Sequence, residues 1–220
     1  MDKRPEFSFT HDAGVAEFTV PTSKYLDTYP DASFGYIAIS ALVVDSRAQA
    51  NPRLLLLQRA ASDSNPNKWE PPGGASDDDD PSILHAAARE LWEETGLMAA
   101  HIAGLAGHPY IFTLRNGKRV CRFNFTVYAE RDDGVLPVVQ LDPKEHQKFV
   151  WATEDEVRAG KVGDIDLHFT REEVARTSLQ VLEKAGQKEM HGIDICLHDN
   201  DTSSGTAQQK ASPTANGSRD

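Results

Sequence analysis

Three glutamates near the middle of the chain have a spacing suited to metal chemistry. Glu90, Glu93 and Glu94 are related as i, i+3 and i+4, so on a helix they project from one side. At about 4 Å and an effective dielectric near 20, each contact between like charges costs on the order of 4 kcal/mol. Arg89, four residues before Glu93, can relieve one such contact but not all of them. The cluster therefore predicts a divalent cation with oxygen ligands, Mg²⁺ or Mn²⁺.

The alternative is an exposed helix with a solvated charged stripe, and the surrounding residues argue against it. The neighbouring face is apolar at helical spacing and must pack on a core: Leu84, Ala87, Ala88 and Leu91. Upstream, Gly73 and Gly74 allow a close approach of the backbone, so the Gly74 carbonyl is a candidate further ligand. Gly96 ends the helix directly after the glutamates.

A run of four aspartates, Asp77 to Asp80, precedes this helix and has a structural explanation. Asp80 can accept backbone N–H bonds as the N-cap, and Pro81 suits the first helical position. Acidic side chains are also favoured at a helix N-terminus by the dipole. We therefore expect a helix from about residue 81 to residue 95, capped by Asp80.

Other elements follow from apolar runs and turn signals. Strands are predicted over residues 36–44 and 53–58 and near residues 149–152. Asn116-Gly117 lies between two segments of high β propensity, which predicts a hairpin. Thr170 and Glu173 form a capping-box pattern that opens a second helix, with Gly186 at its end. Strands that alternate with a few helices predict an α/β or α+β fold.

The two ends of the chain differ from this central part. Residues 1–34 are predicted to form an extension packed on the domain, with one strand over residues 15–20. Residues 35–186 are the predicted domain. Residues 187–220 become rich in small polar residues and are predicted to be largely disordered, although "GIDICL" within them could dock as an edge strand.

Composition narrows the functional class. The chain has 220 residues, 39% of them hydrophobic, which suits one domain, and a formal net charge of -11. Such a charge disfavours binding to nucleic acid polymers and to anionic membranes. Two cysteines, Cys121 and Cys196, give no disulfide framework, and no apolar stretch resembles a signal peptide or a membrane span. We expect a cytoplasmic protein; the oligomeric state stays open, with a homodimer as one option.

The stretch around the glutamates resembles the Nudix box, whose consensus is G-x5-E-x7-R-E-U-x-E-E-x-G-U, where U is bulky and aliphatic. The match comprises Gly74 and then Arg89, Glu90, Leu91, Glu93, Glu94, Gly96 and Leu97. Two departures occur. Asp80 replaces the first glutamate of the family, and eight residues rather than seven separate it from Arg89.

The resemblance implies a Nudix-type mixed β-sheet sandwiched between α-helices, and a pyrophosphatase that hydrolyses a diphosphate joined to another group X. It implies metal ligands at Glu90, Glu93 and Glu94, with Arg89 orienting them and Gly74 as a further ligand. Glu145 resembles the loop glutamate that completes the metal site or activates water in many members. A solvent-exposed loop acid is the alternative there.

The substrate is less constrained by the sequence. Arg59 and Arg122 are candidates to bind phosphate, and Trp69 and Phe123 are candidates to stack on a base or line an apolar pocket. Both a nucleoside diphosphate derivative and a prenyl or terpenyl diphosphate remain open, as does a Nudix-like module that binds a nucleotide without cleaving it. His146 and His168 are each either catalytic or structural.

Overall fold

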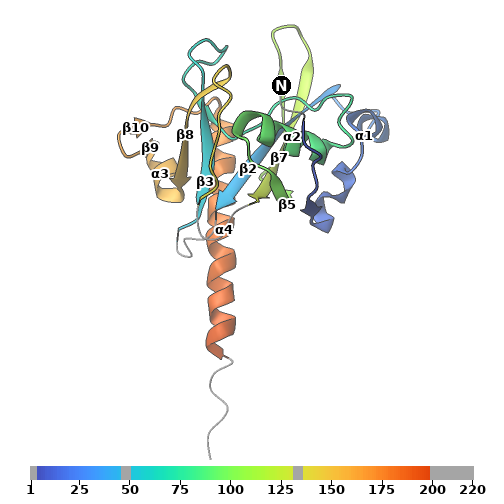
Figure 1. The fold of residues 1–220 in the computed structure, drawn as a ribbon. Helices are drawn as coiled ribbons and strands as arrows, with labels where there is room; N and C mark the ends of the chain where they lie inside the picture. The colour runs from blue at the N-terminus through green and yellow to red at the C-terminus, as the bar shows by residue number, and fades with distance from the viewer. Residues whose placement is uncertain (1–3, 46–50, 131–135, 199–220) are drawn as a thin grey trace, which may run out of the picture.

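A mixed β-sheet of eight strands forms the centre of the molecule, in the order β1-β5-β7-β2-β3-β4, with β6 paired to β7 and β8 paired to β3. The computed structural model describes residues 4–45, 51–130 and 136–198, and side chains as far as Gln187. The strands of this sheet are β1 (Thr10–His11), β2 (Tyr36–Asp45), β3 (Arg53–Arg59), β4 (Trp69–Glu70), β5 (Ala99–Leu105), β6 (Tyr110–Thr113), β7 (Arg119–Ala129) and β8 (His146–Thr153) (Figure 1).

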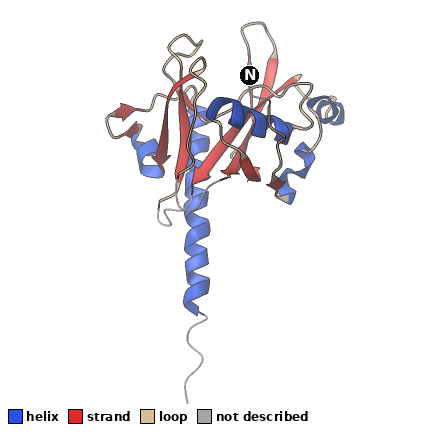
Figure 2. Cartoon of the chain, viewed as in Figure 1, coloured by secondary structure: helices blue, strands red, loops and turns tan. Residues whose placement is uncertain are grey.

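The helices flank this sheet, and a small two-stranded sheet lies apart from it (Figure 2). The remaining elements are η1 (Ala13–Phe18, a 3-10 helix), α1 (Thr22–Thr28), α2 (Ile83–Thr95), α3 (Glu154–Ala159), β9 (Lys161–Val162), β10 (Ile165–Asp166) and α4 (Glu172–His198). None of the described helices is both long and apolar enough to cross a bilayer.

Strands β2 and β3 are buried on both faces. In β2, alternate residues belong to two separate cores, with Ile39 on the side of α2 and Leu42 on the side of α4. In β3, Leu55 and Leu56 divide in the same way. A strand covered on both faces reads as a continuous apolar run rather than an alternating one. The predicted sheet between helices is therefore confirmed.

The three predicted strands and the hairpin are confirmed. β6 and β7 pair antiparallel with Thr113 opposite Arg119. The turn between them is closed by a hydrogen bond from the Leu114 N–H to the Lys118 carbonyl (2.8 Å), and Gly117 adopts a positive φ of 81°. Glycine reaches such a φ without steric strain, so the Asn-Gly pair serves the turn as predicted.

The N-terminal strand prediction is wrong. Residues 13–18 form the helix η1, and α1 follows from Thr22. Val15, Phe18 and Tyr25 are buried in the same core as Phe123, so packing against the sheet overrides the local β propensity of this segment. The boundaries proposed at residues 34 and 186 stay a prediction.

The predicted end of the last helix is also wrong. α4 continues through Gly186 to His198, so "GIDICL" is helical rather than an edge strand, and Figure 1 shows the helix running beyond the sheet. A single glycine lowers helix propensity by about 1 kcal/mol relative to alanine and does not by itself end a helix. Residues 199–220, the rest of the tail predicted to be disordered, lie outside the described residues.

Candidate active site

Arg89 is the hub of the Nudix-box helix. Its side chain is only 3% exposed and donates to both carboxylate oxygens of Asp80, at 2.9 Å each. Nη1 donates to Glu90 (2.8 Å) and to Glu93 (2.9 Å), and Nη2 donates to the Ala75 carbonyl (2.8 Å). These contacts fit the predicted orienting role of Arg89. Its guanidinium group holds both the loop before α2 and two glutamates of α2 in place.

Asp80 occupies the place of the family's first glutamate but does not cap the helix. The N-cap is Ser82, whose hydroxyl accepts the N–H of His85 (3.2 Å). The Asp80 carboxylate accepts the Asp77 N–H (2.8 Å) in addition to its bonds from Arg89. The helix begins two residues later than predicted, at Ile83. Because Asp80 is freed from capping, its short side chain can turn back toward Arg89.

The two glycines of the preceding loop are required by close contacts. A Cβ on Gly74 would lie 2.5 Å from Glu90 Oε1, and a Cβ on Gly73 would collide with the backbone of Ile39. The Gly73 N–H donates to Glu94 Oε2 (2.8 Å). The Gly74 carbonyl accepts the Ile39 N–H (2.9 Å), so its role as a metal ligand stays a prediction.

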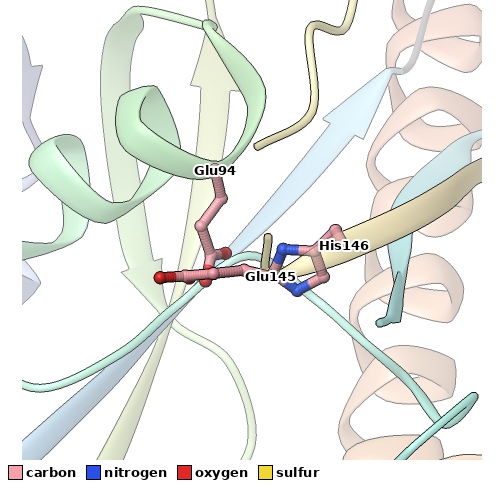
Figure 3. Close-up of side chains that lie close together, drawn as sticks. All are labelled: Glu94, Glu145 and His146. Atoms are coloured by element: carbon pink, nitrogen blue, oxygen red, sulfur yellow. The ribbon is translucent and has the colours of Figure 1, made fainter. Parts of the chain in front are cut away.

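Glu94, Glu145 and His146 converge from distant parts of the chain. Each offers a ligand atom, and these atoms all lie within 4.8 Å of one another. Figure 3 shows Glu94 reaching from α2 toward the side chain of Glu145, with the His146 ring beside them. Burial raises the pKa of Glu94 well above its ordinary value, and the nearby carboxylates of Glu90 and Glu70 raise it further. A buried carboxylate with a raised pKa beside other carboxylates is typical of functional sites.

His146 is the member of this group whose role the sequence left undecided. It is 2% exposed, and neither ring nitrogen has a hydrogen-bond partner among the described residues. Burial lowers its pKa, which favours the neutral imidazole. The available signal was its position directly after Glu145, at the start of a strand.

Glu93 lies outside the convergent group. Its carboxylate pairs with Arg89 on one side and with Arg4 (2.8 Å) on the other. Glu90 lies between the two: burial raises its pKa, although Arg89 acts in the opposite sense, and the carboxylates of Glu93 and Glu145 raise it further. The structure thus brings together Glu90, Glu94 and Glu145 but not Glu93, which was predicted as a ligand and catalytic residue.

A cavity of about 850 Å³ opens in front of these carboxylates. Arg59 and Arg122, both predicted to bind substrate, line it. Trp69 and Phe123 do not line it. Trp69 is fully buried and donates its indole N–H to the Asp166 carbonyl (3.0 Å), and Phe123 packs against the rings of Phe18 and Tyr25. Substrate contact by these two aromatics stays a prediction, which this cavity does not support.

Two acidic or basic residues of the cavity wall were not predicted as site residues, Glu70 and Arg171. Glu70 lies on the two-residue strand β4, too short to carry a periodic signal. Arg171 precedes α4 and reaches the cavity only through the packing of that helix on the sheet.

Comparisons with known proteins agree with this geometry. The NUDIX domain model matches residues 36–172, more than half of the chain, whereas none of the curated proteins compared matches it. Among solved structures, the MutT protein from Methanosarcina mazei Go1 is 26% identical, with a TM-score of 0.49, over 70% of this chain and 96% of that one.

Two further structures share the fold at lower identity. A C. elegans Ap4A hydrolase is 21% identical, with a TM-score of 0.50, over 72% of this chain and 99% of that one. The NUDIX domain of Shewanella oneidensis NrtR, in complex with ADP ribose, is 19% identical, with a TM-score of 0.50, over 76% of this chain and 97% of that one. The domain match spans the glutamate-bearing helix and the strands around it, so the chain belongs to the Nudix family and is a Nudix-type diphosphate hydrolase.

Proposed function

We propose that the chain hydrolyses the diphosphate linkage of a nucleoside diphosphate derivative or another organic diphosphate, with a divalent cation held by Glu90, Glu94 and Glu145. One observation carries this proposal. Glu94, Glu145 and His146 converge, the two glutamates line the cavity, and no Lys or Arg forms an ion pair with either glutamate in the described part of the chain.

The donor set fits such a cation. Glu70 and Glu90 already have cationic partners, in Arg59 and Arg89, whereas Glu94 and Glu145 have none among the described side chains. Carboxylate oxygens suit Mg²⁺ or Mn²⁺, and the unpartnered nitrogens of His146 add a softer donor. A cation would offset the burial and the carboxylate repulsion that together raise the pKa of Glu94.

Each residue has a distinct part in the proposed reaction. A bound cation supplies polarisation of the phosphoryl oxygens and a lower pKa for water. Gly73 fixes Glu94 through its N–H, and Arg89 fixes Glu90. Glu145 is the exposed member of the group, so it can accept a proton from the attacking water and release it to solvent.

The choice of substrates to test follows from the similar folds. Ap4A and ADP ribose are both nucleoside diphosphate derivatives, and each belongs to a protein of similar fold. They are the first compounds to assay, beside a prenyl diphosphate as the apolar alternative.

The experiment combines turnover with metal binding. Phosphate or nucleotide release is measured for this panel with Mg²⁺, with Mn²⁺ and with a chelator, and thermal unfolding is followed under the same conditions. We expect turnover only with metal, and a melting temperature that rises as metal is added, because the ion binds the folded state. If metal changes neither turnover nor melting temperature, the proposal is wrong.

A further inference from the structure

Four cationic side chains line the cavity, and they fall into two groups. Arg59 is neutralised by two carboxylates, Asp63 and Glu70. The other three form no ion pair with any carboxylate that the structure describes: Lys118, Arg122 and Arg171. The second group therefore leaves uncompensated positive charge on the cavity wall.

Each of these three cations rests on an aromatic ring. The guanidinium carbons of Arg171 and Arg122 lie 4.8 Å and 5.9 Å from the centroid of Phe112, and the Lys118 ammonium lies 4.1 Å from that of Tyr36. A ring orients a cation through its quadrupole but does not cancel the charge, as a carboxylate would. The chain has 34 acidic residues against 23 Lys and Arg. Potential acidic partners are therefore abundant, yet this wall holds its cations on neutral rings.

Arg122 also has a hydrogen-bond donor without an acceptor. Its Nη1 donates to Ser40 Oγ (3.2 Å), but its buried Nε has no hydrogen-bond partner among the described atoms. A buried donor left unpaired destabilises the folded state unless a ligand accepts from it. The planar guanidinium presents its N–H groups in a fork that matches phosphate oxygens. The wall thus offers donors suited to an anion with oxygen acceptors.

We propose that this wall binds phosphate groups of the substrate beyond the diphosphate that is cleaved. The inference rests on the proposed function and narrows its substrate class: compounds with a longer polyphosphate chain are preferred over a diphosphate joined to an uncharged apolar group. Arg122 and Arg171 contact these phosphates. Phe112 is a positioning residue that acts through the two guanidinium groups.

A matched series of substrates tests the proposal. Dinucleoside polyphosphates with the same two nucleosides, from the diphosphate to the pentaphosphate, differ only in the number of phosphates. At constant free Mg²⁺, we expect the KM of the wild-type enzyme to fall as phosphates are added. Arg122→Gln and Arg171→Gln should each raise the KM of the longest substrates about tenfold, with kcat little changed, since one charge-assisted contact is lost.

Two further variants separate charge from geometry. Phe112→Leu keeps both arginines but removes the ring, so it should raise the same KM values, and Arg122→Lys should recover part of the loss. Arg119→Gln is the control: it removes one positive charge from the same strand, but Arg119 is exposed and does not line the cavity. Its KM values should match those of the wild type.

Three results would overturn the inference: KM values independent of phosphate number, an equal effect of Arg119→Gln and Arg122→Gln, or a lower KM for a prenyl diphosphate than for the longest polyphosphate. Failure of the proposed function would look different, as absence of hydrolysis across the whole series. In that case, calorimetry measures binding of the same compounds to the metal-free protein and tests the inference without hydrolysis. We expect the affinity to rise with phosphate number and to be lower in Arg122→Gln. An affinity that does not change with phosphate number contradicts the proposal.

Discussion

Arg89 and Asp80 form a bidentate ion pair, with two hydrogen bonds of 2.9 Å between side chains that are each 3% exposed. The pair joins the loop after the glycines to the helix that carries the glutamates. Asp80 is one carbon shorter than the family's glutamate and lies one residue further from Arg89 in sequence. Two residues, Pro81 and Ser82, lie between Asp80 and the start of α2. The Asp80 carboxylate therefore reaches Arg89 despite its shorter side chain and the extra residue.

Asp80→Asn should lower the free energy of unfolding by about 3–5 kcal/mol, because it leaves Arg89 buried with an incomplete counter-charge. Chemical denaturation measures this change. Asp79→Asn is the matched control, since the Asp79 side chain is 78% exposed and its contact with Arg4 is long, at 3.9 Å. Equal destabilisation by the two variants would show that Asp80 contributes only general surface charge.

The contribution of Glu94 to the stability of the metal-free protein should fall as pH rises, and Glu94→Gln should remove that contribution. Burial raises the pKa of Glu94 in the folded state above its ordinary value of 4.5. Between these two values the folded state binds more protons than the unfolded state, so the free energy of unfolding decreases with increasing pH. Unfolding measured with a chelator between about pH 5 and pH 8 tests this. The variant should gain stability relative to wild type as pH increases; a constant difference across that range would contradict the prediction.

Glu94→Gln should lower kcat by about 10²-fold or more, the usual cost of losing a positioned catalytic carboxylate. Glu93→Gln, at the adjacent position, should lower kcat by about tenfold or less, because Glu93 pairs with Arg89 and Arg4 outside the cavity and acts only through the helix. Steady-state kinetics with saturating Mg²⁺ give both values. A larger loss in Glu93→Gln would return Glu93 to the metal site.

Ser82→Ala should destabilise the protein by about 1 kcal/mol through loss of the N-cap. Circular dichroism melts measure the effect. Asp78→Ala is an exposed neighbour in the aspartate run and should change stability by less than about half of that. If Asp80→Ala alone, and not Ser82→Ala, shortened the helix, the cap would lie at Asp80 after all.

Local patterns predicted the parts of the fold that depend on neighbours in sequence. The spacing of Glu90 and Glu94, the apolar face of α2 and the Asn116-Gly117 turn all act within a few residues, and all appear as expected. The strand predicted over residues 15–20 was wrong because contact with β7, and not local propensity, sets their conformation. The helix end predicted at Gly186 was wrong because a glycine ends a helix only where the chain also turns away.

The candidate site needed information that no local pattern contains. Glu145 and His146 reach Glu94 because β8 pairs with β3, with Arg59 opposite His146 after a shift in register, and the Ala60 N–H donates to the Glu145 carbonyl (2.8 Å). Arg59 forms ion pairs with carboxylates and Arg122 forms none with those that the structure describes. This difference likewise depends on which residues the fold brings next to each arginine. That Trp69 is fully buried could not be predicted, because an aromatic in a core and one in a pocket look alike in sequence.

The helices η1 and α1 share a core with the segment that the family model matches. Phe18 lies 4.9 Å from Phe123 and 5.2 Å from Phe125 between ring centroids, although the segment shared with the family begins at residue 36. Removing the preceding residues would expose these rings of β7 to water and forfeit about 1.5–3 kcal/mol for each large apolar side chain no longer buried. We therefore expect a chain that begins at residue 36 to be less stable than one that keeps η1 and α1, because the side chains of these two helices belong to the same core as β7.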